Sequence, residues 1–133
     1  MRQIVRTDRV HEPTTPSYSH AVRAGPWLIV AGQVARAPDG GIVGPGDVTA
    51  QTRQALANIR ALVEAAGGTL DDVVETIVYV TDMRHRDTVM DLLAAHFPAP
   101  APASTLVQVV ALANEAFLIE ISARALLPAR APS

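Results

Sequence analysis

An acidic residue near the end of the sequence stands where a carboxylate could transfer protons. Between residues 117 and 124 apolar and polar side chains alternate, which is typical of a β-strand buried on one face. Glu120 falls on the more polar side, and its simpler interpretation is a solvated strand residue. If a neighbouring subunit covered that side, burial would raise the pKa of the carboxyl, as a general acid or base near neutral pH requires.

Two side chains farther upstream are candidates for the same chemistry. Tyr18 follows a proline-containing loop, and its phenol could donate a hydrogen bond to a substrate, although an ordinary half-buried tyrosine is the simpler alternative. His20 would share a face with Tyr18 if a strand began there, and the alternative is a histidine packed at the start of a strand. Residues 84–86, Arg-His-Arg, are a solvated turn or, alternatively, a contact for an anion or an RNA phosphate.

The composition excludes several classes of chemistry. The sequence has no cysteine, so thiolate nucleophiles, disulfides and thiolate metal sites are excluded, and a cytoplasmic location is the default expectation. All 11 basic residues are arginine, so no lysine can form a Schiff base. The four histidines share no metal-ligand spacing, and we expect neither a metal nor a cofactor. A formal net charge of −2 argues against nucleic acid as a partner.

A chain of 133 residues, 49% of them hydrophobic, has the size and composition of one compact domain. We expect a single domain over residues 1–133, with its core at about 13–126. The polar N-terminus lacks the apolar region of a signal peptide, and no apolar run is long enough to span a bilayer, so no membrane partner is expected.

Hydrophobic periodicity predicts the order β, β-hairpin, α, β, α, β, β. Asp47 is a suitable N-cap for the first helix, and Gly67 ends that helix. Asp87 or Thr88 is expected to cap the second helix, which Pro98 stops. The expected elements are a short strand at 4–5, a hairpin of 18–24 and 27–33, helices at 48–66 and 88–97, and strands at 72–82, 105–112 and 117–124.

This order suits an α+β fold in which two helices cover one face of a mixed sheet. The central strand carries apolar side chains in both alternating positions, so two helices can bury only one of the two sets. The sets are Val73, Ile77 and Tyr79 on one side and Val74, Val78 and Val80 on the other. An apolar sheet face that stays uncovered predicts a homo-oligomer.

Five segments resemble, in order and spacing, the Rid family, which is also called the YjgF or L-PSP endoribonuclease-like family. They are residues 16–22, 30–34, 52–59, 80–82 and 119–121. The resemblance implies a chorismate-mutase-like fold and a homotrimeric barrel, with a ligand cleft between each pair of neighbouring subunits. Typical members hydrolyse reactive enamines or imines, such as 2-aminoacrylate, without metal or cofactor. In them an arginine clamps the substrate carboxylate, while a tyrosine and a glutamate position and activate water.

Carried over by position, Tyr18 matches the tyrosine and Glu120 the glutamate. Ser104 stands in the place of the arginine, Met90 in the place of an asparagine common in deaminating members, and Ala31 in the place of a serine. Besides the catalytic pair, the residues expected to contact substrate are Ser104, Gln33, Gly32, Ala31, Met90 and Leu106.

The missing arginine changes the expected substrate. Loss of one partner of a desolvated charge pair costs about 2 to 5 kcal/mol, so efficient hydrolysis of 2-aminoacrylate is not expected. Unless Arg36, Arg84 or Arg86 enters the cleft, a neutral or bulkier substrate is favoured.

The sequence therefore predicts a divergent enzyme of imine, enamine or carbonyl chemistry, with a small ligand at subunit interfaces. A non-catalytic trimeric module that binds a metabolite or a partner protein is the alternative. Endoribonuclease activity is the remote alternative, because the chain is net acidic and only 4% aromatic.

Overall fold

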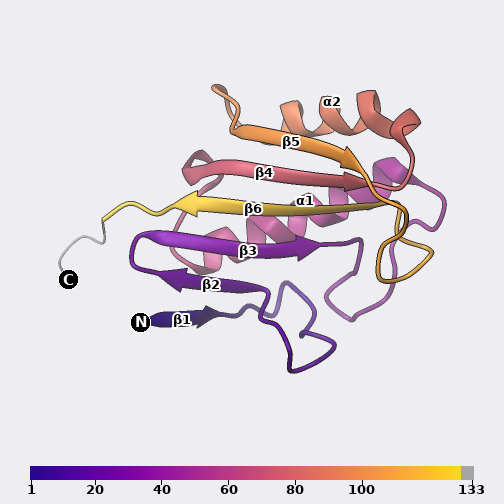
Figure 1. The fold of residues 1–133 in the computed structure, drawn as a ribbon. Helices are drawn as coiled ribbons and strands as arrows, with labels where there is room; N and C mark the ends of the chain where they lie inside the picture. The colour runs from indigo at the N-terminus through magenta and orange to yellow at the C-terminus, as the bar shows by residue number, and fades with distance from the viewer. Residues whose placement is uncertain (130–133) are drawn as a thin grey trace.

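Six strands form one mixed sheet, and both long helices lie against the same face of it in this computed structural model, which describes residues 1–129 (Figure 1). The strand order is β1-β2-β3-β6-β4-β5; β4 and β5 run parallel, and the other neighbours run antiparallel. The elements are β1 (Arg2–Val5), β2 (Ala21–Ala24), β3 (Trp27–Gln33), α1 (Val48–Ala65), η1 (Leu70–Asp72), β4 (Val73–Val80), η2 (Met83–His85), α2 (Arg86–His96), β5 (Ala103–Gln108) and β6 (Ile119–Leu126). The predicted α+β class, element order and one-sided placement of the helices are confirmed. The tail predicted from Pro128 onwards includes residues 130–133, which lie outside the described residues.

Helix α1 begins and ends where the sequence indicates. The Asp47 side chain accepts a hydrogen bond from the Ala50 N–H at 3.0 Å, and Gly67 follows the helix with a φ of 91°. A positive φ at this position favours glycine, which has no β-carbon to clash with the backbone. The apolar stripe of α1 packs on β3 and β6 and includes Ala55, Leu56, Ile59, Leu62 and Val63.

Helix α2 begins earlier than predicted. The Asp82 side chain accepts a hydrogen bond at 2.9 Å from the backbone N–H two residues on, which caps the turn η2, and η2 runs directly into α2. The N-cap position of α2 is therefore His85. The predicted caps Asp87 and Thr88 are wrong, because the upstream turn places both residues in the first helical turn.

The last two strands are displaced from their predicted ranges by the strand between them. β4 ends at Val80, so β5 has no strand to pair with beyond Gln108 and does not extend to Leu112. Ile119 is the residue that pairs with Val80, and β6 therefore begins there, two residues later than Phe117.

A register shift in β4 overturns part of the predicted alternation. The shift lies between Val73 and Glu75, opposite β6. Val73 is buried with Val78 and Val80, whereas Val74 is 41% exposed. The predicted sets are wrong for Val73 and Val74 because the extra residue of a bulge moves the preceding side chains to the other face.

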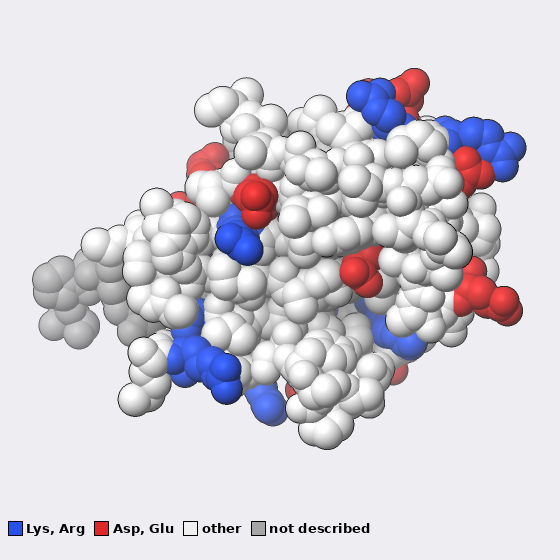
Figure 2. All heavy atoms as spheres, in the orientation of Figure 1, with Lys and Arg blue, Asp and Glu red and all other residues white. Residues whose placement is uncertain are grey.

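The helix-free face of the sheet keeps apolar side chains at its surface. Trp27 is 43%, Ile29 40% and Leu126 44% exposed. Figure 2 shows this side of the molecule with few charged side chains across its centre. One ion pair crosses it, from Arg124 Nε to Glu75 Oε1 at 3.5 Å. An uncovered apolar face is what the sequence predicted. Among the described residues, neither helix is long and apolar enough to cross a bilayer.

Candidate active site

A hollow of about 340 Å³ opens where the end of β3 meets the beginning of β6. Its wall contains Tyr18 and His20 from the segment before β2, residues 31–33 from β3, Arg36 from the following loop, and Glu120 from β6. The other lining residues are His11, Thr14, Val34, Ala113 and Phe117. We call this cavity the Glu120 hollow. It brings the predicted catalytic pair together with Ala31, Gly32 and Gln33.

Gly32 allows the Glu120 side chain to lie against the backbone of β3. A β-carbon added to Gly32 would lie 2.5 Å from Glu120 Cδ and 2.8 Å from Glu120 Cγ, closer than real β-carbon contacts. The register of β3 against β6 shifts between Val30 and Gln33, so two residues of β3 stand opposite one residue of β6. The close approach at this bulge, and not a turn conformation, is what requires glycine.

The environment of Glu120 favours a carboxyl that can exchange protons. The side chain is half-buried, and this burial raises the pKa of its carboxyl above the ordinary value. Among the side chains described, no arginine or histidine lies within 4.0 Å of it as an ion-pair partner. No cation in the described chain therefore offsets the cost of desolvating the carboxylate.

Tyr18, His20 and His11 pack together in the wall of the hollow. The ring of His20 lies 4.6 Å from that of His11 and 5.5 Å from that of Tyr18, in both cases edge to face. The Tyr18 hydroxyl accepts a hydrogen bond from the Thr14 N–H at 3.1 Å. Strand β2 begins only at Ala21, so Tyr18 and His20 meet through ring packing and not through a shared strand face.

Gln33 determines which nitrogen of His20 carries the proton. Gln33 Nε2 donates to Ala31 O and to His20 Nδ1, both at 3.1 Å, so the His20 proton is assigned to Nε2. Burial, and next the nearby His11, lower the pKa of His20 below its ordinary value. In the described chain His20 Nε2 and Gln33 Oε1 are buried without a hydrogen-bond partner. Across residues 1–129, no three His, Asp or Glu side chains gather as metal ligands would.

Ser104 and Met90 line a different pocket, of about 120 Å³. Its walls are mainly apolar and come from α2, β4 and the segment that leads into β5. At its edge the Thr76 hydroxyl donates to Ser104 Oγ at 3.0 Å. Leu106 is half-buried and packs against the core of the sheet. We call this cavity the Ser104 pocket. Within one chain, three of the predicted substrate contacts thus lie outside the Glu120 hollow.

Residues 10–127 match the family model described as endoribonuclease L-PSP. The chain belongs to the endoribonuclease L-PSP family. A RutC family protein of Pyrococcus horikoshii is 39% identical over 123 residues, which are 92% of this chain and 96% of the relative. The crystal structure of YyfA from Yersinia pestis, described as a Rid family protein of unknown function, has a TM-score of 0.89 and 32% identity and covers 96% of this chain and 100% of its own. The mouse 2-iminobutanoate/2-iminopropanoate deaminase is 33% identical over 112 residues, 84% of this chain and 82% of its own. The predicted Rid resemblance is confirmed.

Of the three arginines considered as a substitute clamp in this L-PSP family chain, the structure brings Arg36 to the Glu120 hollow. Arg84 pairs with Asp82 at 2.6 Å, and Arg86 pairs with Asp87 at 3.0 Å, at the start of α2. Hydrogen bonds from Arg84 lower the pKa of Asp82 to about 2. Neither Arg84 nor Arg86 lines the Glu120 hollow or the Ser104 pocket.

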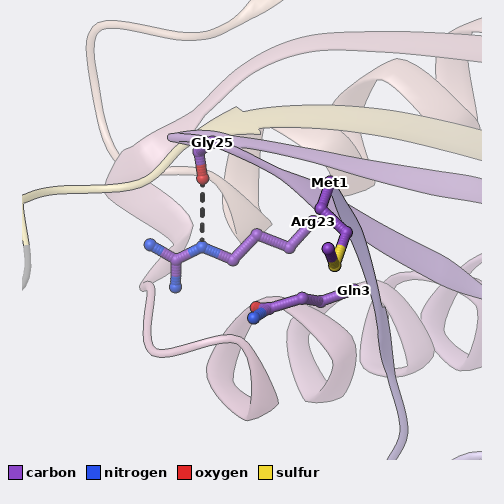
Figure 3. A pocket seen from close by; sticks show the side chains of 4 residues that line it. All are labelled: Met1, Gln3, Arg23 and Gly25. Carbon is purple, nitrogen blue, oxygen red and sulfur yellow. Dashed lines mark hydrogen bonds between the residues drawn. The ribbon is translucent and has the colours of Figure 1, made fainter.

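A further hollow lies over the edge strands β1 and β2, where Arg23 is the charged residue (Figure 3). Arg23 Nε donates to Gly25 O and Nη1 to Ala66 O, both at 3.2 Å. The other lining residues are Met1, Gln3 and Gly25, so the lining described includes no carboxylate or imidazole side chain. The Arg23 contacts join the β2–β3 turn to the end of α1 and explain the hollow as a structural feature.

Two buried polar residues of α1 hold the loops around the Glu120 hollow, and the sequence analysis missed their role. Asn58 Nδ2 donates to Arg36 O at 3.1 Å. Gln51 Nε2 donates to Ala116 O at 2.8 Å, and Gln51 Oε1 accepts from the Leu118 N–H at 2.8 Å. Both amides are buried on a helix face that is otherwise mostly apolar. That break in the pattern was the available indication.

Proposed function

We propose that this protein is an enzyme that moves protons on a small imine, enamine or carbonyl metabolite, with Glu120 as acid and base and Tyr18 as an orienting donor. The observation that carries the proposal is a half-buried carboxyl of raised pKa in a hollow shared with a phenol. A positioned acid–base group contributes about 10²- to 10⁴-fold to a rate. Hydrolysis, dehydration, tautomerisation and cyclisation of such substrates all fit this pair. A cytoplasmic location, expected from the cysteine-free sequence, is part of the proposal.

Hydrolysis of a protonated imine shows how the pair would act. The Glu120 carboxylate takes a proton from water as the water oxygen bonds to the imine carbon, which gives a neutral carbinolamine. The carboxyl returns that proton to nitrogen, the C–N bond breaks, and the hydroxyl proton leaves with ammonia as ammonium. A carbonyl product and a carboxylate remain. The Tyr18 hydroxyl accepts a hydrogen bond from the Thr14 N–H and also lies 3.3 Å from Thr14 Oγ1, so its O–H can donate to substrate when Thr14 Oγ1 is the donor in that pair. The name of the mouse relative describes a reaction of this class.

The cleft in this proposal lies between subunits of a homotrimer, the assembly that is characteristic of the family. The apolar helix-free face supports this assembly, because Glu120 lies on that face, directly opposite Tyr79 in the register of β6 and β4. A neighbouring chain could then bring its Ser104, Met90 and Leu106 to the Glu120 hollow.

The proposal does not extend to efficient hydrolysis of 2-aminoacrylate through the usual carboxylate clamp. A serine in place of the arginine would weaken binding of a carboxylate by about 2 to 5 kcal/mol, on the order of 30- to several-thousand-fold. The Ser104 hydroxyl accepts a hydrogen bond from Thr76, and it cannot form the two parallel charge-assisted bonds of a guanidinium.

The test measures ammonia release from 2-iminobutanoate, 2-iminopropanoate and a panel of uncharged imines, each generated in the assay. Glu120→Gln is compared with Glu115→Gln, which makes the same change at an exposed residue of the preceding loop. We expect wild-type turnover on at least one imine, a loss of about 100-fold or more in Glu120→Gln, and no comparable loss in Glu115→Gln. Light scattering should show a trimer for all three proteins.

Four outcomes would contradict the proposal. Full activity in Glu120→Gln would remove that residue from the mechanism. Thermal stabilisation by ligands without turnover would instead support a binding module. A monomer in solution would remove the cleft, and rapid turnover of 2-iminopropanoate would show that a serine at position 104 does not prevent efficient hydrolysis of a 2-imino acid.

A further inference from the structure

Arg36 lines the Glu120 hollow with most of its hydrogen-bonding capacity unused. A guanidinium carries five N–H donors, and the described residues provide one acceptor, Gly40 O, 2.8 Å from Nη1. Within residues 1–129 no carboxylate lies within 4.0 Å of this guanidinium. A half-buried cation without a counter-ion, in a cavity of ligand size, is a group that an anion would neutralise.

The fold holds Arg36 in place for such a role. Its guanidinium carbon lies 5.2 Å from the ring centre of Phe117, a cation–π distance. Asn58 fixes the backbone of Arg36, and Gln51 fixes the segment on both sides of Phe117. A cation–π contact is an electrostatic attraction to the ring, so it does not replace the acceptors that the guanidinium N–H groups can bind.

Three of the other arginines described above are already engaged. Arg23 donates to two backbone carbonyls, and Arg84 and Arg86 pair with aspartates. Arg36 differs from them because it shares its cavity with Glu120, and because these two residues form no ion pair. Their charged groups are therefore more than 4.0 Å apart, and a ligand can lie between them.

We propose that Arg36 binds the carboxylate of the substrate, which is a small carbonyl or imine compound with an acid group. The carboxylate lies at the guanidinium, and the carbonyl or imine carbon lies toward Glu120. The anion is thus held at a position different from that of Ser104. This inference rests on the proposed function of the hollow and deepens it by naming the substrate class and the residue that selects it.

The experiment measures binding by NMR titration of the full-length assembled protein. The probes are 2-oxobutanoate and 4-oxopentanoate, with 4-oxopentanamide as the uncharged analogue. Arg36→Gln is compared with Arg53→Gln, which removes the same charge from an exposed position of α1. We expect at least one acid to bind wild type, with its Kd about tenfold or more higher in Arg36→Gln and unchanged in Arg53→Gln. Binding of the amide should be weaker and the same in all three proteins.

One further variant separates charge from structure. Arg36→Lys keeps the charge without the planar fork and should bind the acid with intermediate affinity. Binding of an acid to wild type through Arg36, without turnover of any imine, would contradict the proposed function and not this inference. Absence of acid binding to wild type, or equal affinity in wild type and Arg36→Gln, would overturn the inference.

Discussion

The Glu120 hollow and the Ser104 pocket are held together by different kinds of interaction. The loops around the hollow are held by two buried amides of α1, which bond to backbone groups at 2.8 to 3.1 Å. The walls of the pocket are apolar, and one hydroxyl pair, Thr76 with Ser104, lies among them. Hydrogen bonds fix direction, whereas apolar packing fixes volume. The hollow is therefore suited to orient charged and proton-transferring groups, and the pocket is suited to select shape.

The largest expected effect is loss of the frame of the hollow in Gln51→Leu. This change leaves the partly buried Ala116 carbonyl and Leu118 N–H without partners, at about 1 to 3 kcal/mol for each group. We expect the free energy of unfolding to fall by about 3 kcal/mol, measured by urea denaturation. Met90→Leu in the Ser104 pocket should lower it by less than about 1.5 kcal/mol. Equal losses in the two variants would remove the distinction between the two sites.

The next effect concerns the contact between β3 and Glu120. Gly32→Ala places a β-carbon within 2.5 Å of Glu120 Cδ and displaces the carboxyl. A misplacement of about 1 Å costs about 100-fold in rate, so kcat should fall by that amount. The double variant Gly32→Ala/Glu120→Ala should recover the thermal stability that the single variant loses, because the clash is removed. Unchanged kcat in Gly32→Ala would show that the position of the carboxyl does not matter.

A smaller effect is expected where the Ser104 pocket gains a charge. Ser104→Arg supplies the guanidinium that the family resemblance assigns to this position, and we expect kcat/KM on 2-iminopropanoate to rise about tenfold. Ser104→Ala is the control, and it removes the bond to Thr76 at a cost of about 0.5 to 1.5 kcal/mol of stability. No gain in Ser104→Arg would mean that this pocket does not reach the substrate.

The smallest effect is a pH dependence that arises in the wall of the hollow. The folded state depresses the pKa of His20, so the unfolded chain binds a proton first as the pH falls. Stability should therefore be complete above the unfolded value of 6.5 and decline as the pH falls through the folded value. His20→Gln should reduce this slope by at most one proton, as measured by denaturation between pH 5 and 8. His85→Gln is the control at a histidine outside the hollow, and His96, whose pKa is also lowered by burial, contributes to the slope that remains in both variants.

Features that depend on neighbouring residues in the chain could be predicted from the sequence. Asp47 and Gly67 bound α1 because an N-cap and a left-handed C-terminal glycine act within one helical turn. The alternation of apolar and polar side chains along β6 likewise predicted the face of the sheet on which Glu120 lies, because successive side chains of a strand point to opposite faces. In contrast, the start of α2 depended on a capped turn that has no strong sequence pattern.

Features that depend on pairing between distant segments could not be predicted. The shift between Val73 and Glu75 exists only relative to β6, and no single-segment pattern encodes it. The place of Arg36 in the hollow depends on Asn58, 22 residues away, and on the ring of Phe117. The division of the predicted contacts between two cavities has the same origin, because Ser104 and Glu120 are brought to separate places by strand order.

Because β3 contains a bulge, the shape of the Glu120 hollow depends on the number of residues in β3 as well as on their types. Val30 pairs with Ala123 and Gln33 with Ile121. Between these two pairs β3 has two residues and β6 has one, so β3 contains one extra residue. Deletion of Ala31 would leave both pairs able to form and would keep every later strand in phase. The sheet could then remain folded while the β3 backbone no longer lies against the Glu120 carboxyl. A change of one residue in length could therefore abolish activity without unfolding the protein.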